Sequence, residues 1–389
     1  MTEPVVTPAE WTFLLYMDSP ASEQLSADQD LLQRLVKIAS WSPRFNLVYE
    51  IGEDDAVIRG RIVSHELQPL QRLPRVDSIA RAITSFVDWA AATFPSRYTA
   101  LFLRDHGTVL SSRYPKGKPG ARSWLIPNVP GPSQSPAGGD RARATKGKSG
   151  GRTLNQRSIR TAISGTKRGC VDLYGFDACE MGFAEFAYEV RDVTSYVVSS
   201  ELIIQVDDFP YDAGIQAATR DLASGPLGVA MAIADAKSEL FAATEVGWMD
   251  KLAKPLDGLG TYLDPLTTQN LDALMALRKA LPTTGDSGVD LGQLLDALRT
   301  LAVRGGGSRE TLDKLIAEVD RYMSRACLSN GRVLVYGKPA AGLALSFPQL
   351  NTLWAMLDYG GLEFARKTAW GSFIFDYLQG VADRYIYPS

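Results

Sequence analysis

Short, continuous apolar runs alternate along the chain with segments that are apolar at every third or fourth position. The continuous runs predict strands buried on both faces, because such strands show no polar alternation. The spaced segments predict amphipathic helices. The predicted strands are residues 11–18, 45–54, 98–107, 170–179, 195–202 and 245–250, and the predicted helices are residues 28–41, 75–94, 153–165, 182–193 and 227–243. This alternation predicts an α/β fold with a mostly parallel sheet and helices on both faces.

The last third of the chain has a different pattern. Residues 251–330 are predicted to be mostly helical, and two later apolar runs, "GRVLVYG" and "GLALSFP", predict strands. A helical tail is expected around Trp370 and Phe373. We therefore expect two parts: an α/β domain at residues 1–250, and a helical C-terminal subdomain at residues 251–389 whose strands return to the sheet.

Residues 113–152 interrupt the α/β domain with Gly, Pro, Ser and basic residues. A segment of this composition cannot bury a core and predicts a long flexible loop. Loops of this length inside a compact domain are usually functional or disordered.

Composition narrows the class of protein. The formal net charge of −3 provides no field for nucleic acid or a membrane surface, so neither is expected as a partner. The first apolar run is short, broken by Asp18 and preceded by no basic segment, which predicts neither a signal peptide nor a membrane span. The three cysteines, Cys170, Cys179 and Cys327, are too scattered for a disulfide framework or a zinc site. A cytoplasmic location is expected.

Two predicted strands end in residues that suit nucleophilic chemistry. His106 lies at the end of the strand at 98–107, and Cys179 at the end of the strand at 170–179. Sites in open parallel sheets form outside the carboxyl ends of the strands, so the two side chains meet if these strands are neighbours. A histidine beside a thiol removes its proton, and the thiolate attacks a carbonyl carbon. Gly107 would let a substrate carbonyl approach the backbone closely.

The other histidine and cysteines have simpler interpretations. His65, in "IVSHELQP", has no acid partner in view and is expected to be structural. Cys170 begins a strand and Cys327 follows a helix, so both are expected to be buried packing residues.

The motifs "RDHG" and "GFDACEMG", each after a predicted strand, resemble the histidine and cysteine motifs of the clostripain family of cysteine peptidases. The resemblance covers most of the chain. "WTFLLYMD" is similar to the opening strand of the family, and "LEFARKTAWGSFIFDYL" is similar to its closing helix. The resemblance implies a caspase-like α/β/α sandwich and a cysteine endopeptidase that cuts proteins or peptides after Arg or Lys.

The resemblance also implies a role for each matching residue. Cys179 matches the nucleophile, and His106 matches the general base and acid. Gly107 matches the residue whose backbone N–H, with that of Cys179, holds the developing oxyanion. Asp177 matches an acid at the base of the pocket for the side chain before the scissile bond, where a carboxylate favours Arg or Lys.

The sequence departs from the family pattern around the predicted pocket and keeps the two catalytic residues. Arg104 stands where the family usually has Trp, and Glu180 stands where it usually has an apolar residue. The segment "LIIQVDDFPY" replaces an acidic, Gly-rich loop after the strand at 195–202. Two interpretations stay open for the acids there, which either line the substrate pocket or belong to a solvated loop: Glu201, Asp207 and Asp208.

The chemistry itself requires no cofactor, and no metal site is predicted. A dependence on calcium is implied only by the family resemblance. The segment "MDSPASEQL" offers few oxygen ligands for it.

Clostripain-like peptidases are typically processed between the two motifs, which gives residues 113–152 an implied role. The accessible end of this loop is rich in residues after which such an enzyme would cut: Arg141, Arg143, Lys146, Lys148 and Arg152. One interpretation is an autoinhibitory segment of a zymogen, cleaved by the enzyme itself or by an upstream protease in an intracellular bacterial cascade. The other interpretation is a solvated basic insertion.

Two other functions compete with the peptidase. A degenerate relative would bind peptides without cutting them, but the chain retains both His106 and Cys179. A nucleotide-binding α/β protein would need a Gly-rich turn after its first strand, and "YMDSPASEQ" contains no glycine.

Overall fold

The structure is a computed structural model that describes most of the chain. The described residues are 8–17, 22–38, 42–53, 56–104, 156–220, 225–284, 287–301, 308–328, 333–349 and 359–386. His106, Gly107 and the loop at 113–152, with the predicted processing residues from Arg141 to Arg152, lie outside this set. The predictions for these residues therefore stay predictions.

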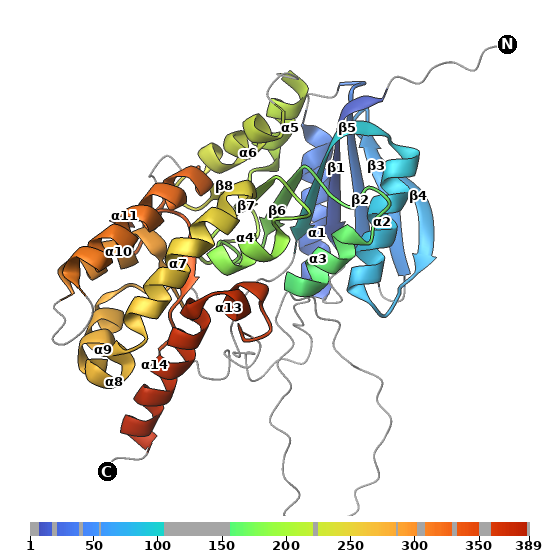
Figure 1. Cartoon of the computed structure of the whole chain (residues 1–389). Coiled ribbons are helices and arrows are strands. Elements are labelled where there is room, and N and C mark those ends of the chain that lie inside the picture. The colour runs from blue at the N-terminus through green and yellow to red at the C-terminus, as the bar shows by residue number, and fades with distance from the viewer. Residues whose placement is uncertain are drawn as a thin grey trace, which may run out of the picture.

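An eight-stranded sheet forms the centre of the molecule, with strand order β4-β3-β2-β1-β5-β6-β7-β8 (Figure 1). The strands from β2 to β7 in this order are parallel, whereas β3, β4 and β8 pair antiparallel with their neighbours. Their bounds are β1 Ala9–Met17, β2 Phe45–Gly52, β3 Ala56–Val63, β4 Glu66–Pro74, β5 Ser96–Arg104, β6 Leu173–Asp177, β7 Tyr196–Ser199 and β8 Ala242–Glu245. The predicted mostly parallel α/β fold is confirmed.

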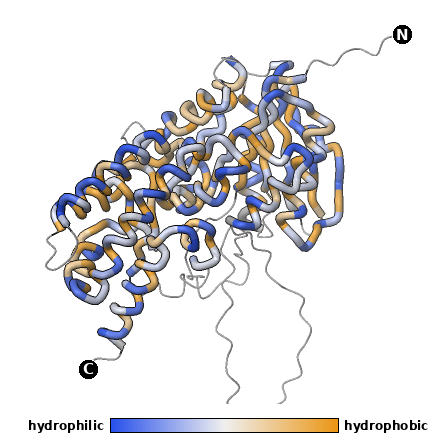
Figure 2. Tube along the Cα trace, viewed as in Figure 1, coloured by the Kyte–Doolittle hydropathy of each residue, from blue (hydrophilic) through white to orange (hydrophobic). Residues whose placement is uncertain are grey.

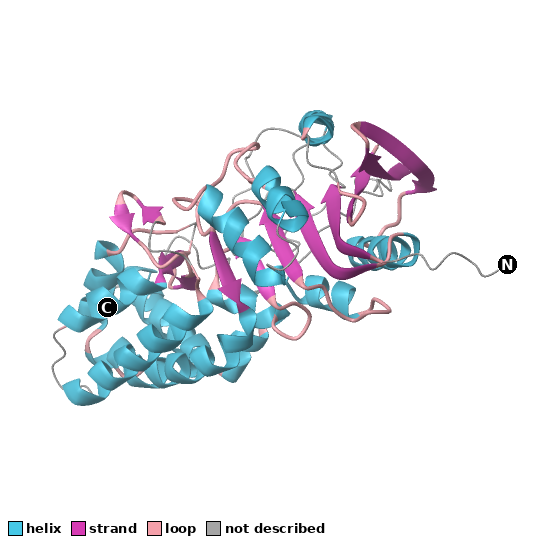
Figure 3. Cartoon of the chain, turned by 90° about the horizontal axis from the view of Figure 1, so that it is seen from above, coloured by secondary structure: helices cyan, strands magenta, loops and turns pink. Residues whose placement is uncertain are grey.

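Helices cover both faces of the sheet (Figure 3). One face carries α1 Ser22–Lys37, α5 Tyr211–Arg220 and α6 Gly225–Ala236, and the other carries α2 Ile79–Thr93, α3 Gln156–Ser164 and α4 Ala184–Val190. The apolar positions of these helices bury two separate cores, one on each face of the sheet. Figure 2 shows the outer helices with both hydrophilic and hydrophobic stretches, as expected for helices with one buried side.

The C-terminal part is mainly helical and begins after a short 3-10 turn, η1, at Val246–Trp248. Its helices are α7 Met249–Leu263, α8 Leu266–Gln269, α9 Leu271–Ala280, α10 Leu291–Thr300, α11 Arg309–Ala326, α13 Glu363–Lys367 and α14 Ala369–Ile386. Its strands form two small sheets, β9 Gly288–Asp290 with β12 Ala344–Ser346, and β10 Leu334–Val335 with β11 Lys338–Pro339. None of the helices in the described part of the chain has the length and apolarity needed to cross a membrane.

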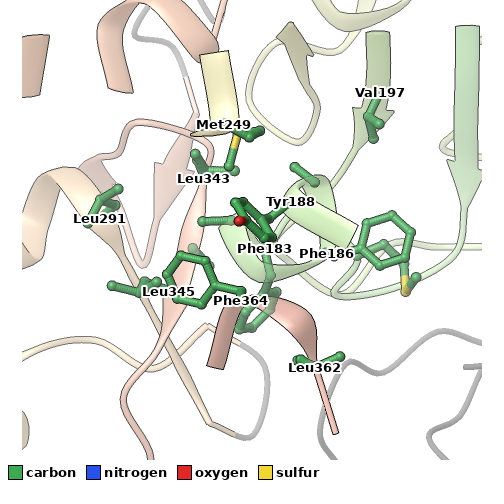
Figure 4. Packing of buried hydrophobic residues seen from close by; sticks show 14 of the residues in the cluster. Phe183, Phe186, Tyr188, Val197, Met249, Leu291, Leu343, Leu345, Leu362 and Phe364 are labelled. Atoms are coloured by element: carbon green, nitrogen blue, oxygen red, sulfur yellow. The ribbon is translucent and has the colours of Figure 1, made fainter. Parts of the chain in front are cut away.

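The C-terminal part packs directly against α4. Figure 4 shows Phe183 and Tyr188 beside Leu343, Leu345 and Phe364, and all five are buried in one core. A parallel bridge also joins Phe183 to Ala344 of β12. The segment that follows the cysteine motif is therefore held in place by residues more than 150 positions later in the chain.

A buried carboxylate adds polar bonds to this contact. Glu185 of α4 is fully buried and accepts hydrogen bonds from the Ser346 backbone N–H (2.8 Å) and the Tyr359 hydroxyl (3.1 Å). Burial raises the pKa of Glu185, and these donors oppose the shift. The interface therefore depends on hydrogen bonds as well as on apolar packing.

Candidate functional site

The two strands that carry the predicted catalytic motifs lie side by side. β5 and β6 are parallel neighbours, and Arg104, the last residue of β5, pairs in register with Asp177, the last residue of β6. The adjacency that the sequence argument required is confirmed. In the sequence Cys179 follows Asp177 by two positions and His106 follows Arg104 by two, and the two strands that precede them end at the same edge of the sheet.

A tight turn fixes the backbone just after Cys179. The backbone N–H groups of Met181 and Gly182 both donate to the Ser200 carbonyl at 2.8 Å, at the end of β7. A Cβ at Gly182 would lie 2.7 Å from the Glu201 backbone nitrogen, so only glycine fits there. Glu180 has φ 57°, a left-handed conformation that costs a non-glycine residue about 1–2 kcal/mol. Strain of this kind clusters at functional sites, as a turn that presents a nucleophile would require.

The Cys179 thiol is half-buried beneath the segment after β7. The Ile204 backbone N–H donates to Sγ at 3.4 Å, and Sγ–H donates to the Ile204 carbonyl at 3.5 Å. Burial raises the pKa of the Cys179 thiol, and the nearby carboxylates of Glu180 and Asp177 raise it further. The thiol is therefore protonated at neutral pH in this arrangement, and attack on a carbonyl requires a base that removes its proton.

A buried ionic cluster lies beside the thiol. The Arg104 Nε donates to Asp28 Oδ1 at 2.9 Å, and Arg104 Nη1 donates to Asp177 and to the Val206 carbonyl, the latter at 2.8 Å. The Tyr211 hydroxyl also donates to Asp177, at 3.0 Å. The exposed fractions of Arg104, Asp28 and Asp177 are 2%, 1% and 4%. Asp177 is thus not the free pocket carboxylate that the sequence argument assumed, because it already holds a cation of its own chain.

The two members of this pair shift each other's protonation. Burial raises the pKa of Asp177, while the guanidinium of Arg104 and the Tyr211 hydroxyl oppose that shift. Burial disfavours the charge on Arg104, but Asp177 and Asp28 more than offset it and raise the pKa of the guanidinium. Arg104 is therefore charged at every accessible pH.

Asp207 and Asp208 border a cavity of about 290 Å³ that Tyr211 also lines. Asp207 pairs with Arg34 Nη2 at 2.9 Å and is 70% exposed. Asp208 accepts from Lys237 Nζ at 2.6 Å and from the Gln205 backbone N–H at 2.7 Å. Burial acts against ionisation of Asp208, but Lys237 outweighs it and lowers the pKa. Both acids lie near the cluster, and both already hold a basic partner.

Glu201 points away from this cavity, toward the C-terminal part. It is 1% exposed and faces Asp290, which accepts from the backbone N–H groups of Gln293 (2.8 Å), Ala341 (2.8 Å) and Gly342 (3.2 Å). Burial, together with the charge of Asp290, raises the pKa of Glu201 well above its usual value. Burial raises the pKa of Asp290 to about 6. The structure therefore separates Glu201 from the two acids with which the sequence grouped it.

The Glu201–Asp290 pair predicts a pH-dependent stability. Both folded-state pKa values lie above the unfolded ones, so the folded state holds protons that the unfolded state releases, and stability falls as the pH rises from about 4 through 6. Glu201→Gln removes one ionisable group with a raised pKa, and we expect the stability difference between pH 5 and pH 8 to shrink. Urea unfolding at both pH values measures it, with exposed Asp207→Asn as the control. An unchanged pH dependence would contradict this assignment.

The remaining candidates have structural surroundings. Cys327 is buried, and its Sγ lies 2.9 Å from the Ala341 carbonyl. The exposed His65 has Nδ1 at 2.9 Å from the Val36 carbonyl. Sequence reasoning missed Asp28 and Tyr211 and treated Arg104 only as a departure from the family pattern. The one available signal was a basic residue two positions before His106, at a strand end where it would face Asp177.

Comparison with known proteins connects this site to one family. Residues 140–258 match the model of the clostripain family. None of the curated proteins matches the sequence. The match spans Cys179, the cluster residue Asp177 and the acids after β7.

Solved structures share the fold over nearly the whole chain. An inactive zymogen C11 protease from Parabacteroides distasonis is similar at TM-score 0.64 and 18% identity, covering 94% of this chain and 99% of that one. A secreted C11 cysteine protease from Bacteroides thetaiotaomicron is similar at TM-score 0.63 and 14% identity, covering 93% and 100%. The same protease with an irreversible peptide inhibitor also has TM-score 0.63 and 14% identity, covering 94% and 100%. The likeness to the clostripain family of cysteine peptidases, first visible in two short motifs, is confirmed by the family model and by the fold.

Proposed function

We propose that this chain is a cysteine endopeptidase with Cys179 as nucleophile and His106 as general base and acid. The observation that carries the proposal is the register of β5 and β6, which pairs Arg104 with Asp177, so that the two strands preceding the motifs end at one edge of the sheet. The strained turn at Glu180 supports it, because it holds the thiol at the end of a buried strand.

The reaction is an acyl transfer in two steps. His106 removes the thiol proton, Cys179 Sγ forms a bond to the carbonyl carbon, and the oxyanion accepts from the backbone N–H groups of Gly107 and Cys179. The intermediate collapses, the peptide C–N bond breaks, and His106 gives its proton to the leaving amine. Water, deprotonated by His106, then hydrolyses the thioester and releases the Cys179 thiol.

The proposal includes a resting form in which the thiol is not yet reactive. Burial raises the pKa of the Cys179 thiol and the Ile204 backbone contacts its sulfur, which supports an activation step. We assign that step to cleavage within residues 113–152, in cis or by an upstream protease of a proteolytic cascade. An inactive zymogen occurs among the solved structures of similar fold, which supports this part.

The preference for Arg or Lys before the scissile bond is the most detailed part of the sequence-based prediction. It depends on a carboxylate of Asp177 that a substrate cation can reach. In the structure Arg104 holds that carboxylate, which removes the physical reason for the preference.

Covalent labelling tests the reaction and the activation together. The full chain, intact or nicked by limited trypsin treatment, is incubated with a peptide chloromethyl ketone and analysed by mass spectrometry. We expect an adduct on Cys179 in the nicked protein, formed at least ten times faster than in the intact one. No adduct in either form would leave only a peptide-binding module, and equal rates would show that the loop is not a switch.

A further inference from the structure

The guanidinium of Arg104 contacts both chain segments that flank the Cys179 thiol. It reaches Asp177, which precedes Cys179 by two positions, and the carbonyl of Val206, which follows Ile204 by two positions. The Ile204 backbone is the group that contacts Sγ. A side chain bound next to the thiol and directed at Asp177 would therefore meet Arg104.

Every acid that the sequence placed in the pocket is already paired or directed elsewhere. Asp177 holds Arg104, Asp207 holds Arg34 and Asp208 holds Lys237. Glu201 faces Asp290 in the C-terminal part. Since a surface ion pair is weak, Asp207 is the easiest to detach, but it lies on the exposed rim, where its charge is screened.

A substrate cation at Asp177 would lie beside a second cation in a nearly dry site. The side chains of Arg104 and Asp177 are 2% and 3% exposed, so water screens little of their field. Detaching Arg104 to admit the substrate would leave a buried charge without its partner, which is strongly unfavourable. A substrate carboxylate would lie beside the buried carboxylate of Asp177, and like charges repel each other strongly in a dry site. This is the kind of repulsive element by which sites exclude unwanted ligands.

Apolar side chains are available to a substrate among the described residues here. Ile203 and Val206 are 67% and 49% exposed in the segment that contacts the thiol. Leu31 and Phe209 line the neighbouring cavity, and the pairs Asp207–Arg34 and Asp208–Lys237 line it too. An apolar lining whose charges are already paired with each other suits an uncharged side chain.

We infer that Arg104 sets the specificity of this site: the pocket beside Cys179 excludes Arg and Lys and takes an uncharged, apolar side chain before the scissile bond. The inference rests on the proposed peptidase function and replaces the preference for basic residues implied by the family resemblance. Arg104 acts by holding Asp177 and has no part in the bond-breaking steps.

The test compares peptides that differ only in the residue before the scissile bond, which is Leu, Arg, Lys or Asp. With nicked wild-type protein, kcat/KM for the Leu peptide should exceed that for each charged peptide at least tenfold. The double variant Arg104→Leu with Asp28→Asn removes one charge of each sign and frees Asp177. Its Arg-to-Leu ratio of kcat/KM should rise at least tenfold above the wild-type ratio.

A matched control removes another buried arginine–carboxylate pair. Arg59 of β3 and Glu50 of β2 are 6% and 0% exposed in their side chains and lie on strands that do not adjoin β5 or β6. The variant Arg59→Leu with Glu50→Gln should keep the wild-type ratio. If the Arg104 double variant does not fold, Asp177→Asn decides instead: the inference expects the Arg-to-Leu ratio to change less than threefold, whereas a free pocket acid would lose Arg cleavage more than tenfold.

Binding separates failure of the inference from failure of the proposed reaction. Calorimetric titration of nicked Cys179→Ala protein with the same peptides should give at least tenfold tighter binding of Leu than of Arg. If nothing is cut but this order holds, the specificity stands and the catalysis falls. Tighter binding of the Arg or Lys peptide, preferred cleavage after them, or no binding of any peptide would overturn the inference.

Discussion

Replacing Cys179 by alanine should abolish peptide hydrolysis, with kcat falling by about four to six orders of magnitude. The sulfur of Cys179 is the atom that bonds to the acyl group of the intermediate. The residual rate of the alanine variant therefore comes from substrate positioning and oxyanion contacts alone. His106→Ala should lower kcat by several orders of magnitude, because the thiol pKa is raised and no thiolate forms without a base. Steady-state assays on nicked protein with a fluorogenic peptide ending in Leu or Arg measure both losses.

The other two cysteines provide the control. Cys170→Ala and Cys327→Ala should keep most of the activity, since Cys170 lies before the start of β6 and Cys327 at the end of α11. Thermal unfolding of each variant checks that it is folded. Substantial activity in Cys179→Ala, or its loss in Cys170→Ala, would remove the basis of the mechanism.

Replacing Glu185 by alanine should lower the free energy of unfolding by about 3–5 kcal/mol. The substitution leaves a cavity in the core and removes the acceptor for the Ser346 N–H and the Tyr359 hydroxyl. Those donors belong to the C-terminal part, so its contact with α4 should weaken first. Urea unfolding followed by circular dichroism measures the change, and limited proteolysis should show earlier cleavage after residue 340.

Glu185→Gln is the matched variant. The amide of glutamine is close in shape to the carboxyl group of Glu185. It keeps an oxygen acceptor, and the expected loss is about 1 kcal/mol. Equal losses for both variants would show that volume alone, not the hydrogen bonds to Ser346 and Tyr359, accounts for the effect.

The parallel core of the fold could be predicted because its strands are buried on both faces. β1 is buried along its whole length, so its sequence is one apolar run that periodicity detects directly. The hairpin of β3 and β4 was not predicted. β4 is an edge strand that is largely exposed and contains Pro69, so nothing in its composition separates it from a loop.

The candidate site shows a similar limit. Asp177 and Cys179 follow a recognisable strand, and their placement at its end needed only the sequence. The partners of Asp177 did not, because Arg104 and Tyr211 lie 73 and 34 positions away and Asp28 lies on a helix after β1. When an acidic residue is considered from the sequence without its neighbours in space, it is assumed to have no basic partner. Whether it is paired depends on which side chains the packing of β1, β5 and β6 brings beside it.

The chain leaves the sheet after β5 and returns to it at β6, and these strands are hydrogen-bonded neighbours from Ala100–Leu173 to Arg104–Asp177. A cut anywhere between them therefore changes the molecularity of folding. The cut protein consists of two chains that share one sheet, and neither holds all the strands of its parallel core. Once unfolded, the halves must meet by diffusion, so refolding becomes second order and slows on dilution, whereas the uncut chain refolds at a rate independent of concentration. After an activating cut, a molecule that unfolds would therefore refold slowly at low concentration, whereas the uncut chain would refold readily.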